Sequence, residues 1–172
     1  MREFIGFGGV VLTADVYGNQ DHPCVVLLPG ITQTRKVWVS AAKALAQAGR
    51  YVISLDLRGH GGSDSPKDCN YSLEAFMGDL VAVLAQLESR PVVVGSNFGG
   101  WIGLAALGNT SAPIATGLVL TNPPPEFQSL NNESIAKQSA SEHPVRILIK
   151  VCLQVALILL NCKTNLSPQP RA

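Results

Sequence analysis

The sequence has little charge and few aromatic side chains. Charged residues make up 15% and aromatic residues 6% of the 172 residues, and the formal net charge is only +1. No strong basic field is therefore available to attract nucleic acid or an anionic membrane, and neither is expected as a partner. Hydrophobic residues, at 47%, supply enough apolar surface to exclude a wholly disordered chain and to predict one globular domain.

Cysteine pairs and long apolar runs are also lacking. The four cysteines form no CxxC motif, so we expect no disulfide framework and no zinc knuckle. No set of His and Cys residues has the spacing of metal ligands, so no metal is expected. GFGG at residues 6–9 lacks the strand-then-helix context of a dinucleotide-binding motif, and no cofactor is expected. The N-terminus has no basic segment followed by an apolar run, which predicts a cytoplasmic protein with reduced cysteines. The most apolar stretch, residues 145–160, is interrupted by Arg146, Lys150 and Gln154 and is too short to predict a membrane span.

Short apolar runs alternate with helical patterns over residues 1–125. An antiparallel hairpin is expected over residues 3–16, before the alternation begins. Strand–helix alternation predicts an α/β fold, with a mostly parallel sheet and helices on both faces. The expected strands cover residues 24–30, 51–57, 91–95 and 117–125, and the expected helices cover residues 34–48, 72–87 and 99–107.

The alternation ends at Pro125, which predicts a core over residues 1–125 and a divergent C-terminal segment over 126–172. Within this segment, residues 145–160 are apolar and 161–172 are expected to form a frayed tail. The apolar stretch has three interpretations: a helix or strand covering the open sheet edge, a helix that binds a membrane or partner, or the product of truncation, splicing or a shifted reading frame. The change of composition favours the last as its origin. Exposed apolar surface also predicts self-association.

The most informative motif is VVVGSNFGGWIG at residues 92–103. A buried strand enters it and a helix leaves it, which is the context of a nucleophile elbow, G-x-nucleophile-x-G. Gly95 and Gly99 occupy the two positions where strand and helix nearly touch, and Asn97 lies at the centre. The central residue needs a positive φ, which asparagine tolerates better than most residues.

Four motifs in this order resemble the α/β-hydrolase family over residues 1 to 122. The resemblance implies a partial α/β-hydrolase fold whose last strands and lid are missing, and an ancestral hydrolysis of an ester or related bond. It also implies that the backbone N–H groups of Ile31 and Phe98 are oxyanion-hole donors. The motifs are LLPG at 27–30, SLDLRGHGGSD at 54–64, YSLEAFMGDL at 71–80 and the elbow.

The sequence departs from the family where the chemistry is done. Asn97 stands where the family usually has serine, and a carboxamide has no acidic proton for a base to remove. The family places an acid and then a histidine after the nucleophile, but the only histidine beyond Asn97 is His143, directly after Glu142. Adjacent residues are poorly placed to form an acid–histidine pair. We therefore predict a truncated hydrolase by ancestry, a pseudoenzyme with lost or much reduced catalysis.

Two alternatives remain open. One is an active esterase-like hydrolase that uses non-standard residues. The other is a non-catalytic binding or interaction module that uses the old pocket or the apolar C-terminal stretch. In the pocket, the amides of Ile31 and Phe98 would hold a small carbonyl or carboxylate ligand. The Asn97-Phe98 pair also resembles family members whose nucleophile is an aspartate followed by an aromatic residue, and deamidation of Asn97 would create that carboxylate. Asp56 and His60 are interpreted as residues that order a loop.

Overall fold

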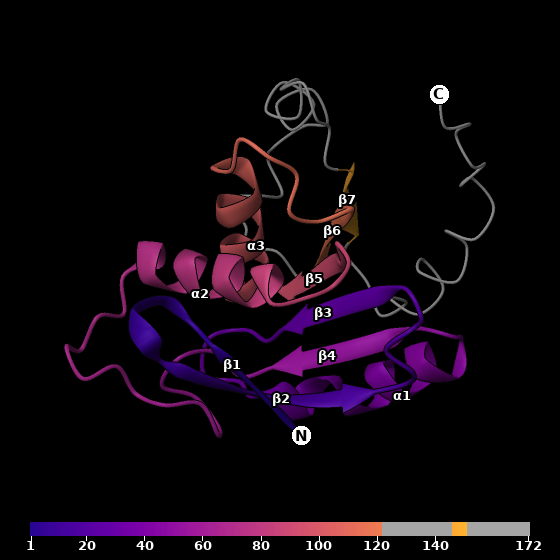
Figure 1. Cartoon of the computed structure of the whole chain (residues 1–172), viewed down its shortest axis with the longest axis horizontal. Coiled ribbons are helices and arrows are strands. Elements are labelled where there is room, and N and C mark those ends of the chain that lie inside the picture. Colours follow the sequence, from indigo (N-terminus) through magenta and orange to yellow (C-terminus); the bar gives the residue numbers. More distant parts are fainter. Residues whose placement is uncertain (122–145, 151–172) are drawn as a thin grey trace.

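A computed structural model describes residues 1–121 and the backbone of residues 146–150. Its strands form one seven-stranded sheet in the order β1-β2-β4-β3-β5-β6-β7 (Figure 1). The first two strands pair antiparallel, β2 pairs antiparallel with β4, and all other pairs are parallel. The predicted hairpin and the predicted mostly parallel sheet are thus confirmed. The strands are β1 (Arg2–Ile5), β2 (Val11–Tyr17), β3 (Cys24–Leu28), β4 (Tyr51–Leu55), β5 (Val92–Ser96), β6 (Gly117–Thr121) and β7 (Arg146–Lys150).

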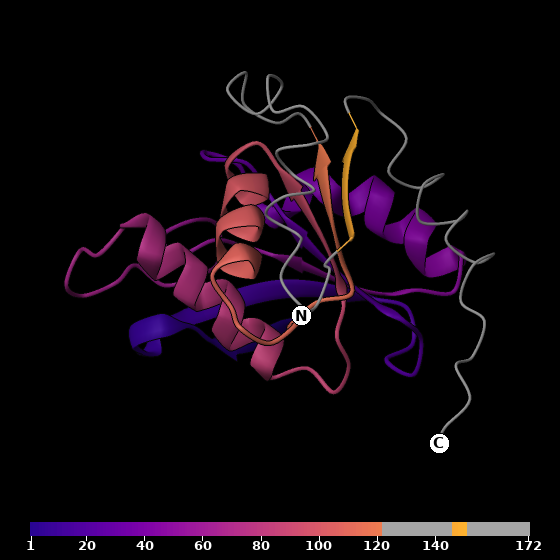
Figure 2. The same ribbon diagram turned by 90° about the horizontal axis from the view of Figure 1, so that it is seen from above.

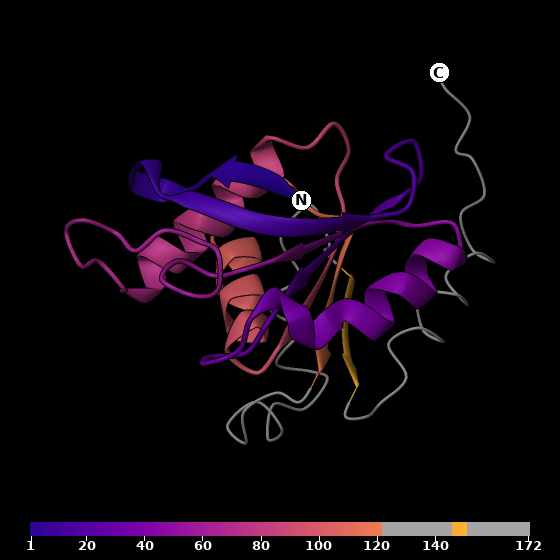
Figure 3. The ribbon, with the colours of Figure 1, turned by 90° about the horizontal axis from the view of Figure 1, so that it is seen from below.

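Helices cover both faces of the sheet, as the sequence predicts (Figures 2 and 3). The helix α1 (Val39–Gln47) lies on one face, and α2 (Leu73–Ala85) and α3 (Phe98–Gly108) lie on the other. A short 3-10 helix, η2 (Arg35–Trp38), leads into α1, and another, η1 (Phe7–Gly9), joins β1 to β2.

The strands feed two separate apolar layers because successive side chains point to opposite faces. In β3, Val25 and Leu27 pack in the layer against α1, whereas Val26 and Leu28 pack in the layer against α2 and α3. Every residue of β3 and β4 is buried, as expected for parallel strands covered on both sides.

The strand β7 is an addition to the sequence-based picture, in which neither later strand of the family was found. It pairs parallel with β6, with Lys150 opposite Thr121. Of the three interpretations of residues 145–160, a strand that covers the sheet edge is therefore the one seen over Arg146–Lys150. Residues 122–145 and 151–172 lie outside the described part, so the boundary at 125, the frayed tail and self-association stay predictions.

Cys24 and Cys69 are both unpaired in the structure. Cys24 is buried in β3, and its burial raises the thiol pKa to about 11, whereas Cys69 is exposed. No helix within residues 1–121 is long and apolar enough to cross a bilayer. The cytoplasmic location stays a prediction.

Candidate functional site

The elbow between β5 and α3 has the predicted sharp bend. Asn97 has φ 49° and ψ −116°, a backbone conformation that side-chain-bearing residues rarely adopt. Strand and helix meet so closely that a Cβ on Gly95 would lie 2.4 Å from the backbone nitrogen of Gly100. A Cβ on Gly99 would lie 2.4 Å from the carbonyl oxygen of Pro29. The glycines therefore permit a turn that larger residues would block.

Backbone hydrogen bonds hold Asn97 on both sides. Its N–H donates to the carbonyl oxygen of Thr121 on β6, at 3.1 Å. Its own carbonyl oxygen accepts from the N–H groups of Gly100 at 3.0 Å and Trp101 at 3.2 Å, which begin α3. The unusual conformation is consequently fixed by the sheet and by the first helical turn.

The side chain of Asn97 folds back onto the helix that follows it. Its Oδ1 accepts a hydrogen bond from the N–H of Phe98 at 2.7 Å. Phe98 is one of the two amides that the family resemblance implies as an oxyanion donor. In the structure this donor already has an acceptor, which belongs to the protein itself. Sequence reasoning missed this contact because it depends on the ψ and side-chain rotamer of Asn97.

The loop that follows β3 packs against the elbow. A Cβ on Gly30 would come within 3.4 Å of the Cβ of Asn97 and 2.9 Å of Gln33 Oε1. That same oxygen of Gln33 accepts from the N–H of Gly30 at 3.0 Å. Ile31, the other expected donor, follows directly; its side chain is 54% exposed, and its N–H donates to no group within residues 1–121. The structure thus brings the two predicted donor segments together, and the part of the chain that it describes supplies no acceptor for the Ile31 N–H.

Phe98 directs its ring into the apolar layer. It packs against Phe76 of α2 in an edge-to-face arrangement, with ring centroids 5.1 Å apart. The aromatic side chain therefore helps to pack α3 against α2. The backbone N–H of Phe98 is the group that contacts Asn97 at the elbow.

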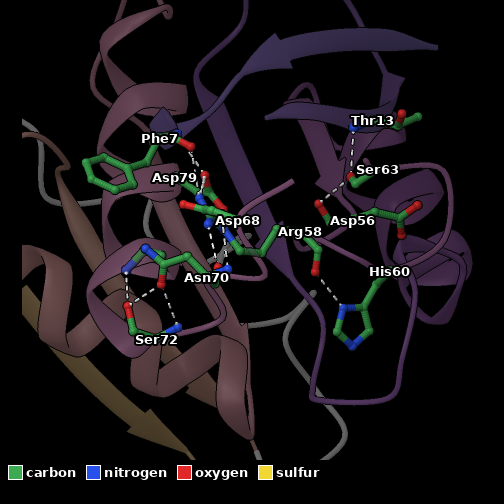
Figure 4. Close-up of polar contacts among 11 residues, drawn as sticks. Phe7, Thr13, Asp56, Arg58, His60, Ser63, Asp68, Asn70, Ser72 and Asp79 are labelled. Atoms are coloured by element: carbon green, nitrogen blue, oxygen red, sulfur yellow. Dashed lines mark hydrogen bonds and ion pairs between the residues drawn. The ribbon is translucent and has the colours of Figure 1, made fainter. Parts of the chain in front are cut away.

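A buried carboxylate orders the loop that follows β4, as predicted for Asp56. Asp56 is fully buried, and its carboxylate accepts from the N–H of Gly62 at 2.8 Å and from the backbone and guanidinium of Arg35. Ser63 donates to the Asp56 carbonyl oxygen at 2.9 Å and accepts from the N–H of Thr13 at 2.9 Å (Figure 4). These contacts tie the loop to β2 and η2, so Asp56 has a structural task.

A second buried ion pair lies beside this loop and escaped sequence reasoning. Arg58 donates through Nε and Nη2 to the two carboxylate oxygens of Asp79, at 2.6 and 2.7 Å (Figure 4). It also donates to the carbonyl oxygens of Asn70 at 2.8 Å and Phe7 at 3.0 Å. The hydrogen bonds that Arg58 donates to the Asp79 carboxylate raise the pKa of Arg58. The available signal was Asp79, a charged residue inside the otherwise apolar pattern of α2.

His60 makes its hydrogen bond within its own loop. Its Nδ1 lies 2.9 Å from the carbonyl oxygen of Arg58, a contact within its own loop (Figure 4). This agrees with its interpretation as a loop-ordering residue. The acids and the histidine beyond the elbow, including Glu142 and His143, lie outside the described residues. Among those that are described, no group of three or more His, Cys, Asp or Glu side chains could hold a metal ion.

A family model described as the alpha/beta hydrolase fold matches residues 23–140. The match spans the parallel strands β3 to β6, the elbow and the loop that contains Ile31. The chain therefore belongs to the α/β-hydrolase fold family.

Individual relatives are hydrolases or proteins of the same superfamily. The AB hydrolase superfamily protein YfhM of Bacillus subtilis is 30% identical over 100 residues, which cover 57% of this chain and 35% of YfhM. Epoxide hydrolase A of Mycobacterium tuberculosis is 34% identical over 100 residues, covering 57% of this chain and 31% of that protein. The chain thus spans about a third of the length of these relatives.

A solved structure gives the same picture. The esterase RhEst1 from Rhodococcus sp. ECU1013 superimposes with a TM-score of 0.62 at 31% sequence identity. The superposition covers 71% of this chain and 45% of the esterase. The resemblance is therefore to the part of the hydrolase fold that holds the elbow.

Proposed function

We propose that this chain is a hydrolase by ancestry that has lost most or all of its catalysis and has kept a small binding site at the elbow. Asn97 carries the proposal: it keeps the strained backbone of a nucleophile while its side chain caps the Phe98 N–H. The ligand would be a small carbonyl or carboxylate compound, since such groups accept hydrogen bonds from backbone amides.

Two features support the loss of turnover. The nitrogen of a carboxamide has a delocalised lone pair and no acidic proton, so Asn97 cannot replace serine as a nucleophile. Asn97 Oδ1 accepts from the Phe98 N–H, and no histidine within residues 1–121 is hydrogen-bonded to the Asn97 side chain. A transition-state oxygen would also have to displace Asn97 Oδ1 before it reached that amide.

Other features support retained binding. The Ile31 N–H is without a protein acceptor in the described part of the chain, and the preceding residue, Gly30, packs against Asn97 at the start of α3. A helix N-terminus favours negative charge, because the peptide dipoles align along the axis. A carboxylate at this position would meet the Ile31 N–H and the positive end of α3.

A working esterase-like or epoxide-hydrolase-like enzyme is the second candidate. The observation in its favour is that an epoxide hydrolase and an esterase are among the similar proteins at 31–34% identity. Such activity would require a nucleophile other than the carboxamide of Asn97, or triad partners supplied by segments beyond those described.

Ester hydrolysis separates the two candidates. We expect p-nitrophenyl acetate to hydrolyse in the presence of the full chain at its uncatalysed rate, and a serine-directed phosphonate should not change that rate. The Asn97→Ser variant restores a hydroxyl but no base, so it too should show no phosphonate-sensitive turnover. Stopped assays with the phosphonate, and intact-mass analysis for an adduct, provide the measurement. Phosphonate-sensitive turnover by the unmodified chain would contradict the proposal and favour the enzyme.

Ligand binding tests the retained site directly. Titration with acetate should shift the backbone amide resonances of Ile31 and Phe98. Asn97→Gly keeps the positive φ without strain and releases the Phe98 N–H, so acetate should bind about two- to tenfold more tightly, the value of one hydrogen bond. Asn109→Ala, at the other end of α3, is the matched control and should leave the affinity unchanged. Static resonances at Ile31 and Phe98 in both the parent and the glycine variant would refute binding.

A further inference from the structure

The backbone of Asn97 places it in contact with the nitrogen of the next residue. At a ψ of −116°, the Phe98 nitrogen of an L residue lies on the same side as the Asn97 Cβ. Helical or extended values of ψ turn that nitrogen away from Cβ. This conformation needs the rare positive φ of 49° that the elbow imposes.

The side chain completes the approach. Asn97 Oδ1 lies 2.7 Å from the Phe98 nitrogen, and the amide carbon Cγ is one covalent bond from that oxygen. Closing a five-membered ring between Cγ and the nitrogen requires this eclipsed arrangement. The contacts of Asn97 with Thr121, Gly100 and Trp101 hold the arrangement in the folded protein, so its conformational cost has already been met.

We propose that Asn97 is a self-modification site, at which the folded elbow promotes cyclisation to a succinimide and hydrolysis to a carboxylate. Hydroxide removes the proton of the Phe98 N–H, the nitrogen forms a bond to Cγ, and the Cγ–Nδ2 bond breaks with release of ammonia after it gains a proton. Water then adds to one of the two imide carbonyls and opens the ring, leaving aspartate or isoaspartate at position 97. No atom is oxidised or reduced, and the only co-reactants are hydroxide and water.

The product would change the electrostatics of the site. A carboxylate at the first position before α3 is favoured by the helix dipole, and it can still accept from the Phe98 N–H. It would also repel a carboxylate ligand. The modification does not depend on the proposed binding function, because it needs only the geometry of Asn97 and Phe98.

Asn109 is a control at the opposite end of the same helix. It follows the end of α3 with φ −101° and ψ 4°, and its side chain donates to the carbonyl oxygen of Ala105. The next residue, Thr110, has a branched side chain, so its amide, like that of Phe98, is not the unhindered amide of a glycine. The two asparagines differ in backbone conformation, which is the variable under test, and in burial, since Asn97 is partly buried and Asn109 is exposed. Burial by itself does not bring the amide carbon toward the next backbone nitrogen.

Peptide mapping by mass spectrometry of the full chain, aged at neutral and mildly alkaline pH, measures the conversion. We expect Asn97 to convert roughly ten- to hundredfold faster than Asn109 in the folded protein, since the strained conformation is already in place. The rate should rise with pH, and hydroxylamine should cleave the chain between positions 97 and 98, as it does at a succinimide. In urea the advantage of Asn97 should disappear.

Asn97→Gln is the matched variant, because its longer side chain would have to close a six-membered ring, and it should not convert on this timescale. Conversion of Asn97 no faster than that of Asn109, or conversion that speeds up in urea, would overturn the proposal. Conversion without a hydroxylamine-sensitive bond would overturn the cyclic route. None of these outcomes depends on ligand binding or ester hydrolysis, so failure here is distinguishable from failure of the proposed function.

Discussion

Replacing Asp79 with alanine is expected to destabilise the protein by about 3–5 kcal/mol, the typical effect of removing one partner of a buried ion pair. Arg58 is 1% exposed and Asp79 4% exposed, so the guanidinium would be left in the interior without its counter-ion. The change would also orphan the N–H of Phe7, which donates to Asp79 Oδ1 at 2.8 Å. Urea unfolding followed by circular dichroism measures the loss, which is a large share of a typical domain stability of about 5–15 kcal/mol.

Lys36→Ala provides the comparison for Asp79→Ala. Lys36 also forms an ion pair, with Asp15, but its side chain is 60% exposed. Solvent screens such a pair, so its loss should change stability by no more than about 1 kcal/mol. Replacing Arg58 with methionine and Asp79 with leucine together should recover part of the loss, because no charge then remains buried. The recovery is incomplete because backbone groups of Phe7 and Asn70 lose their hydrogen-bond partners. A small effect of Asp79→Ala, similar to that of Lys36→Ala, would show that water reaches the pair.

Gly99→Ala is the second change with a large expected effect. The new Cβ would lie 2.4 Å from the carbonyl oxygen of Pro29 and 2.6 Å from that of Leu28, both of them backbone atoms. Neither can rotate out of the way, so β3 and α3 would have to separate. Overpacking of this kind costs about 3 kcal/mol, and the melting temperature or the urea midpoint should fall accordingly.

Gly108→Ala tests the same substitution at the other end of the same helix. Nothing lies within 4 Å of a Cβ at Gly108, and its φ is not positive. Alanine is the better helix former, so this change should stabilise the protein by up to about 1 kcal/mol. If Gly99→Ala lowers the stability and Gly108→Ala raises it, the loss at Gly99 is due to the close contact at the elbow. A neutral Gly99→Ala would mean that strand and helix are less tightly packed than described.

The elements that the sequence predicted correctly are those that local pattern determines. The apolar runs that became β3, β4, β5 and β6 are each bounded by turn residues, and their alternation with helical spacing specifies a parallel sheet. The expected helix 72–87 begins at a serine, a preferred N-cap residue, and the Oγ of Ser72 accepts from the N–H of Ala75 at 3.3 Å. The positive φ of Asn97 followed from the glycines around it and from the tolerance of asparagine.

The features that escaped prediction depend on contacts between distant residues or on rotamers. Arg58 and Asp79 are 21 residues apart, and only the packing of α2 brings them together. The capping of Phe98 by Asn97 requires a ψ value that no pattern encodes. The strand β7 lies in an apolar stretch whose lack of periodicity does not distinguish a strand from a buried helix. The expected helix 34–48 divides into η2 and α1 at Trp38.

The strand order has a consequence for where chemistry can take place. From β3 the chain moves outward to β4, and it then crosses back to β5 on the opposite side of β3. The connection after β3 leads to α1 on one face, whereas that after β5 leads directly to α3 on the other (Figure 2). Neighbouring chain segments diverge at such a topological switch point, which is where open α/β sheets hold their ligands. The order of the strands therefore sets where Gly30 and Asn97 meet. A different side chain at position 97 changes the chemistry of this site without changing its place in the fold.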